Sequence, residues 1–434
     1  MSSQQKKASA EAAASAKKIA LPLKTPTRAE MDKLIEKSAS GHIEEPLELF
    51  LALLRYAHAT RASDIHFEPD REQAVVRLRI DGILHDEFIL PLSIHNRLIS
   101  LIKILTHMRT DEHRAPQDGR YEFQAEKGNV DVRTSIMPTS DGEKAVMRLL
   151  SSESHSLSLE QLGFGEKDLD RVKRAVKKPW GMILATGPTG SGKTTTIYAI
   201  LEMLNNRGVN ISTIEDPVEF YIPGVNQSQV DQAAKVTFAN GLRALLRQDP
   251  DIIMVGEVRD QETAKIAVNA ALTGHKMLST LHTNNAATTI PRLLDMGVEP
   301  FLVASTLILA IAQRLLRRIC PECCITKKVT YEEAKNIVDV QALEELFKKG
   351  KTIEVVEAKG CRACNESGYR GRIGLYEVIA MTEELQKLII RRSSADDIER
   401  QAISEGMTPM MKDGADKVLQ KETTLEEFVR VMYE

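Results

Sequence analysis

Residues 187–194, Gly-Pro-Thr-Gly-Ser-Gly-Lys-Thr, leave few folds open to this chain. They fit the phosphate-binding pattern G-x-x-x-x-G-K-[ST] at every fixed position. In such a loop the glycines allow backbone N–H groups to face inward as a nest for an anion. The ammonium of Lys193 can reach the β- and γ-phosphates of a nucleotide, and the hydroxyl of Thr194 can bind Mg²⁺. The pattern therefore predicts an α/β domain that binds a nucleotide.

The segments on either side of this loop support that interpretation. Residues 181–186 are a short apolar run of the kind found in buried strands. After the loop, Ile197, Ile200, Leu201 and Leu204 recur at the spacing of one helical face, so a helix is expected to begin at the loop. Its N-terminus adds partial positive charge where the phosphate would lie. An accidental glycine-rich turn would require both flanks to be coincidences.

Composition narrows the class of protein further. The 434 residues suggest about three domains. A net charge of −3, a pI near 6.4 and 4% aromatic residues oppose a nucleic-acid binder that neutralises phosphates. Met1–Lys18 has no apolar core of a secretory signal, and the apolar stretch Phe301–Ala312 is too short to span a bilayer and is expected to form a buried helix. We expect a cytoplasmic protein that reaches a membrane through partners.

The chain is expected to comprise several parts. Residues 1–44 have little apolar periodicity, which predicts a flexible tail; an interfacial amphipathic helix is the alternative. Alternating strand patterns and the hairpin signal Asp81-Gly82 indicate a small α+β domain. Around the phosphate loop, strands alternate with helices, which predicts a parallel sheet covered on both faces. The expected divisions are tail 1–44, N-terminal domain 45–152, linker 153–165, core 166–315, cysteine element 316–366 and a helical C-terminal region 367–434.

Acidic residues follow two of the expected core strands. Residues 251–257 form an apolar strand that ends on Glu257, which is placed on the nucleotide side because ligands gather at the carboxyl ends of parallel strands. There Glu257 can hold Mg²⁺ through water or polarise the attacking water. Asp251 falls at the opposite end and is interpreted as structural. Residues 211–219 end in three acids, Glu215, Asp216 and Glu219, which predicts a shared cation; a solvated acidic turn is the alternative.

Two histidines and several arginines are weaker candidates. His275 and His282 flank a short apolar strand, and either could sense a γ-phosphate, although structural roles are equally plausible from the residues alone. Arg120, Arg133 and Arg148 cluster in the N-terminal domain. Arginine forks onto phosphate oxygens, but the residues alone favour solvated strand arginines.

Four of the five cysteines form two C-x-x-C pairs, Cys320 with Cys323 and Cys361 with Cys364. This spacing suits a tetrahedral Zn²⁺ site. Because protein would fill all four positions, the zinc is expected to be structural rather than catalytic; free reduced thiols are the alternative. Cys324 is a spare thiol that could substitute for Cys323 in a shifted register.

Taken together, these motifs closely resemble those of the GspE/PilB-type ATPases, the hexameric motors of type II secretion and type IV pilus assembly. The resemblance extends from about Pro46 to the C-terminus. It is carried by the phosphate loop and by residues 63–69, 79–82, 213–219, 256–260, 275–282 and 313–317. It implies a RecA-like parallel-sheet ATPase core preceded by a small α+β (PAS-like) domain, with an inserted tetracysteine zinc element and a helical C-terminal part.

The resemblance also implies a role for individual residues. Lys193 and Thr194 would bind phosphate and Mg²⁺, Glu219 would activate water, and Glu257 would support the metal. His282 would contact the γ-phosphate, with His275 in the same motif. Arg120 and Arg133 would reach the triphosphate from the N-terminal domain, with Arg148 nearby. The nucleotide is expected to lie against Gly187, Pro188, Thr189, Gly190, Ser191, Gly192, Lys193, Thr194 and Thr195.

The same resemblance implies partners. A homo-hexamer would hydrolyse ATP with Mg²⁺ and push an inner-membrane platform protein of the GspF/PilC kind, with domain motion about the segment 151–158. Such motors usually dock onto a membrane-anchored adaptor through a longer N-terminal region than the 45 or so residues expected here. No nucleic-acid partner is expected. The alternatives are a nucleotide-regulated scaffold with negligible turnover and a RecA-like nucleic-acid translocase.

Overall fold

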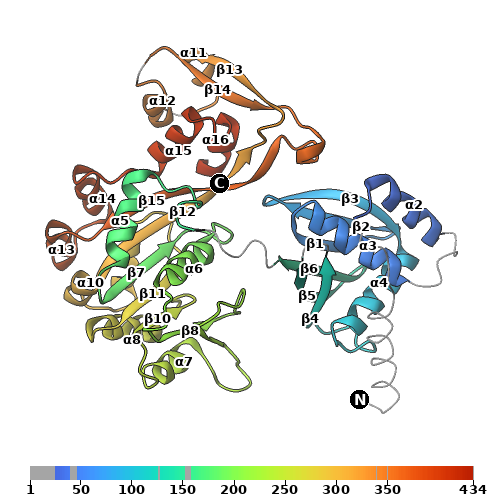
Figure 1. The fold of residues 1–434 in the computed structure, drawn as a ribbon, viewed down its shortest axis with the longest axis horizontal. Helices are drawn as coiled ribbons and strands as arrows, with labels where there is room; N and C mark the ends of the chain where they lie inside the picture. The colour runs from blue at the N-terminus through green and yellow to red at the C-terminus, as the bar shows by residue number, and fades with distance from the viewer. Residues whose placement is uncertain are drawn as a thin grey trace. The chain divides into compact units, whose positions relative to one another are not determined.

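The computed structural model describes residues 25–39, 46–125, 128–151, 158–338, 340–348 and 350–433. The chain divides into two compact units, Met1–His155 and Ser156–Glu434 (Figure 1). The boundary falls within the linker region expected from the sequence. Residues 153–157 of that linker, together with residue 152 before it, lie outside the described residues.

The described part of the N-terminal unit contains a six-stranded antiparallel sheet with the strand order β3-β2-β1-β6-β5-β4. The strands are β1 (Ala62–Pro69), β2 (Gln73–Ile80), β3 (Ile83–Pro91), β4 (Gln117–Ala125), β5 (Gly128–Thr139) and β6 (Gly142–Ser151). Helices α3 (Pro46–Ala59) and α4 (Leu92–Leu105) share a hydrophobic core with the sheet. Asp81 and Gly82 join β2 to β3 with φ angles of 47° and 92°, as a two-residue hairpin requires. The predicted α+β architecture is confirmed.

The predicted flexible tail is wrong over part of its length. Helix α2 (Arg28–Ala39) packs against the N-terminal unit, and its Met31 is fully buried in the core. Leu34 and Ile35 lie partly buried beside it. These three residues follow the i, i+3, i+4 spacing of a helical face, a signal too short to stand out in a polar segment. Residues 1–24 and 40–45 lie outside the described residues.

The second unit is built on a seven-stranded sheet, counted over its described residues, with the order β15-β12-β7-β11-β10-β8-β9. The strands from β12 to β9 run parallel, and β15 pairs antiparallel with β12. Their bounds are β7 (Gly181–Thr186), β8 (Ile211–Glu215), β9 (Asn226–Gln229), β10 (Ile252–Val255), β11 (Lys276–Leu281), β12 (Leu307–Ile319) and β15 (Tyr369–Ala380). The predicted parallel core is confirmed.

Helices cover both faces of this sheet (Figure 1). Successive residues of β7 point to opposite faces, so Met182 and Leu184 belong to one hydrophobic cluster while Ile183 and Ala185 belong to another. The second cluster contains residues of α5 and α6, and the first contains the other helices of the core. The helices are α5 (Glu166–Val176), α6 (Lys193–Leu204), α7 (Phe238–Leu245), α8 (Gln261–Leu272), α9 (Thr289–Asp295), α10 (Pro300–Thr306), α13 (Glu383–Ile390) and α14 (Ala395–Ser404).

Two sequence-based assignments near the sheet edge need correction. The stretch Phe301–Ala312 is not one buried helix, because α10 ends at Thr306 and β12 begins at Leu307, and Phe301 itself is 60% exposed. A short apolar run fits a buried strand as well as a buried helix, and here sheet pairing with β7 decides the outcome. The region 367–434 is also not wholly helical, since Tyr369–Ala380 forms β15 of the core sheet.

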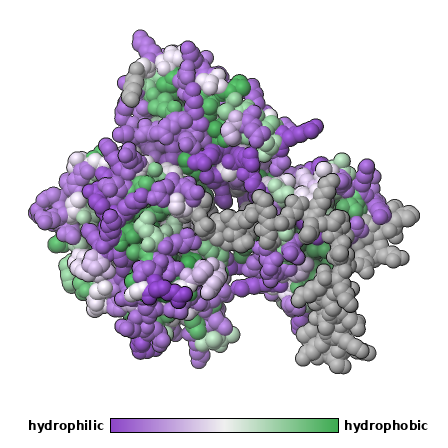
Figure 2. Space-filling model, viewed as in Figure 1, coloured by the Kyte–Doolittle hydropathy of each residue, from purple (hydrophilic) through white to green (hydrophobic). Residues whose placement is uncertain are grey.

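The cysteine-containing element lies between β12 and β15 in the chain. It comprises the antiparallel pair β13 (Cys324–Thr330) and β14 (Thr352–Ala358) with the short helices α11 (Tyr331–Ala334) and α12 (Val340–Leu346). It shares a hydrophobic cluster with α15 (Met410–Leu419) and α16 (Leu425–Tyr433), so it packs on the C-terminal helices. Across the described residues, no helix has both the length and the apolar character to cross a membrane. Figure 2 shows a largely hydrophilic surface on which hydrophobic side chains form small separate patches.

Candidate nucleotide-binding site

The phosphate loop lies where the sequence predicts it, between the end of β7 at Thr186 and the start of α6 at Lys193. Gly187, Gly190 and Gly192 have backbone φ angles of 145°, 81° and 87°, which residues with a side chain rarely adopt. At Gly187 space is also limiting, because an added Cβ would collide with the backbone oxygen of Gln313 on β12. The loop is therefore an open backbone turn at a helix N-terminus, the geometry that binds phosphate.

Lys193 lies within this loop rather than in solvent, with only 9% of its surface exposed. Its ammonium donates hydrogen bonds to the backbone oxygens of Gly187 at 2.8 Å and Pro188 at 3.0 Å. Burial lowers the pKa of Lys193, and the negative charge of Glu257 opposes part of that shift. The cation is thus held beside the nest by neutral carbonyls, and an anionic phosphate would give it a stronger partner.

Glu257 follows β10 at the same edge of the sheet, as the sequence predicts. Its side chain is 14% exposed and lies 2.5 Å from Arg259 and 3.4 Å from Nε2 of His282. His282 directly follows the neighbouring parallel strand β11. Arg259 was not among the sequence-based candidates, although it lies within the quoted motif 256–260. Because it neutralises Glu257 in this arrangement, it belongs to the electrostatics of the site.

The acids after β8 are not arranged as the sequence predicts, with three carboxylates sharing one cation. Glu215 is 2% exposed and accepts hydrogen bonds from the hydroxyls of Tyr198 and Thr213 and from the amide of Gln227. Burial is the main cause that raises the pKa of Glu215. This carboxyl is satisfied by protein donors and needs no metal. Glu219 is only partly buried, and its backbone N–H donates to the Tyr198 hydroxyl at 3.3 Å.

His275 and Asp251 lie at the other edge of the sheet. Both precede their strands, so they are at the amino ends of β11 and β10. His275 contacts the backbone oxygen of Ala270 through Nδ1 at 3.0 Å, and Asp251 accepts the backbone N–H of Asn210 at 2.7 Å. These contacts favour the structural interpretation of both residues. Of the two histidines, only His282 lies with the phosphate loop and Glu257.

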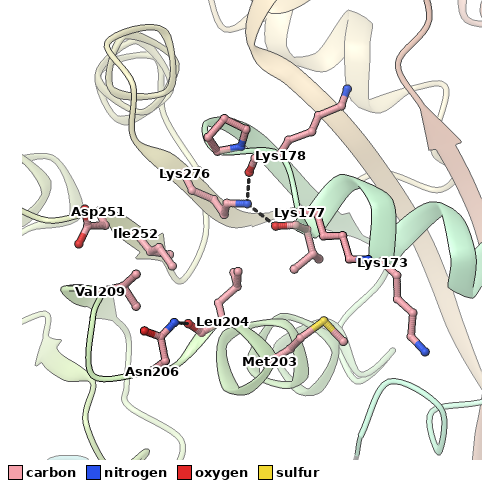
Figure 3. Close-up of a pocket in the computed structure, with 12 residues that line it drawn as sticks. Lys173, Lys177, Lys178, Met203, Leu204, Asn206, Val209, Asp251, Ile252 and Lys276 are labelled. Carbon is pink, nitrogen blue, oxygen red and sulfur yellow. Dashed lines mark hydrogen bonds between the residues drawn. The ribbon is translucent and has the colours of Figure 1, made fainter.

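A cavity of about 570 Å³ opens near these amino ends, not at the phosphate loop (Figure 3). Lys276, the first residue of β11, points toward the end of α5 and donates to the backbone oxygens of Val176 and Lys178. Burial lowers the pKa of Lys276 to about 8. This lysine binds the last carbonyl of α5 and one just beyond the helix, a structural role that accounts for its burial.

In the N-terminal unit, strand register aligns the three candidate arginines. Arg120 on β4 pairs with Arg133 on β5, and Arg133 pairs with Arg148 on β6. Paired residues share one face of a sheet, so the three side chains form a row. Asp64 on β1 continues the row and binds Arg148 at 3.0 Å. Like charges on adjacent strands repel, which makes this face suited to an anion.

The four cysteines converge as predicted. Their sulfur atoms all lie within 4.8 Å of one another, with Cys320–Cys361 at 4.0 Å, Cys323–Cys364 at 3.8 Å and Cys361–Cys364 at 3.7 Å. Sulfurs at the corners of a tetrahedron about 2.3 Å from Zn²⁺ would be about 3.8 Å apart. The donor set therefore fits zinc. Cys324 is not in the group and directs its thiol to the Pro321 oxygen at 3.9 Å.

A glycine loop between a parallel strand and a helix, with acids at the ends of neighbouring strands, defines a phosphate-loop nucleotide-binding protein. Comparison with known proteins places the chain within that class. The model of the family described as Type II/IV secretion system protein matches residues 40–430. The chain therefore belongs to this family.

Two relatives are named after the systems in which they work, and the name of the first also states an ATPase activity. The chain is 46% identical over 407 residues to the type IV pilus assembly ATPase PilB of Myxococcus xanthus, covering 93% of this chain and 70% of the relative. It is 43% identical over 406 residues to the type II secretion system protein E of Pseudomonas aeruginosa, covering 93% and 78%. The expected ATPase of the type II secretion and type IV pilus class is confirmed.

A solved structure supports the fold as well. The pilus retraction motor PilT with bound ADP superposes with a TM-score of 0.59 at 26% identity, covering 88% of this chain and 96% of that one. The RecA-like ATPase core expected from the sequence is thus confirmed. The arrangement around Lys193, Glu257 and His282 lies within this shared core.

Proposed function

We propose that this chain hydrolyses ATP at the loop 187–195 and works as a hexameric motor. The motor would drive assembly of a type II secretion pseudopilus or a type IV pilus at the inner membrane. The observation that carries the proposal is the convergence of Glu257 and His282, at the ends of adjacent parallel strands, on the edge that bears the phosphate loop. The relatives of this chain are named as pilus assembly and secretion proteins, which supports a role in one of these two systems.

Each residue has a distinct task in this proposal. The loop N–H groups and Lys193 bind and orient the phosphates, and Thr194 with Glu257 would hold Mg²⁺, which when bound adds positive charge at the transferred group. Glu219 would orient and deprotonate the attacking water, since it is only partly buried, whereas Glu215 is buried and already hydrogen-bonded. His282 would donate to the terminal phosphate. Charge stabilisation and positioning then supply most of the rate enhancement.

The arginine row would contribute from the N-terminal unit. Arg120 and Arg133 would bind phosphate oxygens of the triphosphate, and Arg148 is restrained by Asp64. A guanidinium that reaches a transferring phosphoryl group is worth about 10³–10⁵ in rate. The four thiols would hold a structural Zn²⁺ that fixes the element between β12 and β15.

The hydrolysis proposal is tested by phosphate release from the purified chain with Mg²⁺ and ATP. Wild type should turn over, and Lys193→Ala should lose both nucleotide binding and hydrolysis. ATP binding without turnover in the wild type would favour a regulated scaffold instead. Stimulation by DNA would favour a translocase.

The assembly and its partners need separate measurements. Sedimentation with and without nucleotide should reveal a hexamer, and a monomer under every condition at micromolar concentration would contradict the ring. The proposed partners are an inner-membrane platform protein and a membrane-anchored adaptor. Co-purification of the platform protein from membranes would support peripheral association with the inner membrane, and its absence after crosslinking would oppose it.

A further inference from the structure

Strand β12 lies directly behind the phosphate loop. It runs parallel to β7, with Ala312 paired to Thr186, so Gln313 lies beside the point where the loop begins. The Gln313 side chain is 1% exposed, and its Nε2 donates a hydrogen bond of 2.7 Å to the backbone oxygen of Ser191. An added Cβ at Gly192 would lie 3.1 Å from the same Nε2 atom. One side chain on β12 therefore contacts the last turn of the loop before Lys193.

This hydrogen bond controls the direction of a backbone donor. In a trans peptide, the C=O of one residue and the N–H of the next point in opposite directions. Holding the Ser191 oxygen toward β12 therefore turns the Gly192 N–H away from β12. Phosphate nests require consecutive N–H groups that point to a common centre. The glutamine amide thus fixes one of the donors on which the nest depends.

The position is costly for folding, which argues for a role beyond packing. Gln313 Oε1 is buried and has no hydrogen-bond partner within the described residues. Turning the amide over would place Oε1 against the Ser191 oxygen, so Nε2 must face the loop. Buried polar atoms without partners are rare in native proteins because they destabilise the fold. An apolar residue here would avoid that orphan atom, as at the preceding positions Ala310, Ile311 and Ala312 of the same strand.

We propose that Gln313 is a positioning residue that holds the Ser191–Gly192 peptide of the phosphate loop in its phosphate-binding orientation. It acts through the loop backbone and does not itself touch the nucleotide. This inference rests on the proposed binding of ATP at 187–195. It gives a function to the first residue of the motif 313–317, to which the family resemblance assigns no role.

The test compares Gln313→Met with wild type in the full-length chain. Methionine has similar length and flexibility but no donor. The dissociation constant for ADP by calorimetry and the KM for ATP should both rise about 10-fold, the factor that matches the loss of one hydrogen bond at 1.4 kcal/mol per decade. Thermal stability should change little. The substitution removes the unpaired Oε1 of Gln313, but it leaves the Ser191 oxygen without its donor instead.

The matched control is Thr306→Val. Thr306 is also buried, and its hydroxyl donates a 2.7 Å hydrogen bond to a backbone oxygen, that of Leu302 in α10. This control should lose some stability but keep the wild-type ADP dissociation constant. If Gln313 had a purely structural role, Gln313→Met should resemble this control. It would then give fewer folded molecules and a lower kcat, but an unchanged KM for ATP. An unchanged KM and dissociation constant in Gln313→Met would overturn the proposal.

A second variant keeps the test decisive if methionine prevents folding. Gln313→Glu preserves the size of the side chain but removes the amide donor and brings negative charge toward the loop oxygen and the phosphates. It should weaken ADP binding more than Gln313→Met does. If wild type binds ADP and both variants bind it within twofold, this inference fails alone. If wild type binds no ADP, the proposed function fails with it.

Discussion

The Nε2 atom of His282 lies 3.4 Å from a carboxylate oxygen of Glu257, although 25 positions of chain numbering separate the two residues. The contact exists because β10 and β11 are parallel neighbours and both end at the edge that carries the phosphate loop. Arg259 contacts the other oxygen of the same carboxylate at 2.5 Å. Two motifs that are distinct in sequence therefore form one charged cluster.

Glu257→Gln should separate nucleotide binding from hydrolysis. The amide keeps the size of the side chain but loses the charge that holds Mg²⁺ and pairs with Arg259, so we expect phosphate release to fall at least about 100-fold. ADP affinity should stay within a few-fold, since Lys193 and the loop are unchanged. Asp251→Asn is the control, because Asp251 precedes the same strand at its opposite end. Equal loss of activity in both variants would contradict the role given to Glu257.

The buried pair Tyr198 and Glu215 predicts a second effect on hydrolysis. The Tyr198 hydroxyl donates to Glu215 and accepts the backbone N–H of Glu219, so it connects a buried carboxylate to the segment that carries the proposed base. Tyr198→Phe should lower stability by about 1–3 kcal/mol because Glu215 loses a buried donor. It should also lower kcat several-fold with little change in the KM for ATP. Tyr221→Phe, at a 74% exposed position nearby in the chain, should change neither.

The cysteine cluster predicts one bound zinc per chain. Metal analysis of the purified protein should find about one equivalent, and Cys361→Ser should reduce it and lower the unfolding temperature because the metal site contributes folding energy. Cys324→Ser is the matched control, since its thiol points to the Pro321 oxygen and not to the cluster. Zinc loss in the Cys324 variant with zinc retained in the Cys361 variant would reverse the ligand assignment.

The arginine row predicts that charge position matters more than total charge. Arg133→Gln should reduce ATP hydrolysis at least about 100-fold if this residue reaches the phosphates. Arg77→Gln removes the same charge from the same sheet at a position outside the arginine row, where Asp86 at 2.8 Å and Glu68 at 3.3 Å bind the guanidinium. That control should therefore keep most activity. Similar rates for both variants would exclude Arg133 from the reaction.

Local signals made much of the site predictable. The strand–loop–helix order fixed the bounds of β7 and α6 because the glycines, the apolar run and the helical periodicity all agree over one short segment. The placement of Glu257 and Asp251 at opposite ends of β10 followed from strand direction alone. Each of these features depends on neighbours in sequence.

The missed features depend on residues far apart in the chain. Residues 307–312 became a strand because β12 pairs with both β7 and β15, which periodicity cannot show. The contact of Gln313 with Ser191 spans 122 positions, and the arginine row requires the exact register of β4, β5 and β6. Arg259 is the exception, because it lies only two positions after Glu257 and so could have been considered from the sequence.

A buried glutamate on β15 makes the stability of the core unit depend on pH. Glu377 is 3% exposed and accepts backbone N–H groups from Ala286 at 2.9 Å and Met410 at 3.5 Å. Burial raises its pKa from 4.5 to about 6. The folded state therefore binds more protons than the unfolded state between these values, so this residue lowers stability as pH rises through 4.5 to 6.

Glu377→Gln removes this titration. Relative to wild type, the variant should gain up to about 2 kcal/mol on going from pH 4 to pH 7, whatever its offset at pH 4, because a pKa shift of about 1.5 corresponds to that energy. The single tryptophan, Trp180, lies in this unit, so its fluorescence can follow unfolding. Glu383→Gln, at an exposed position on α13, should show no such pH-dependent difference. A constant difference between Glu377→Gln and wild type across this range would show that Glu377 titrates alike in both states.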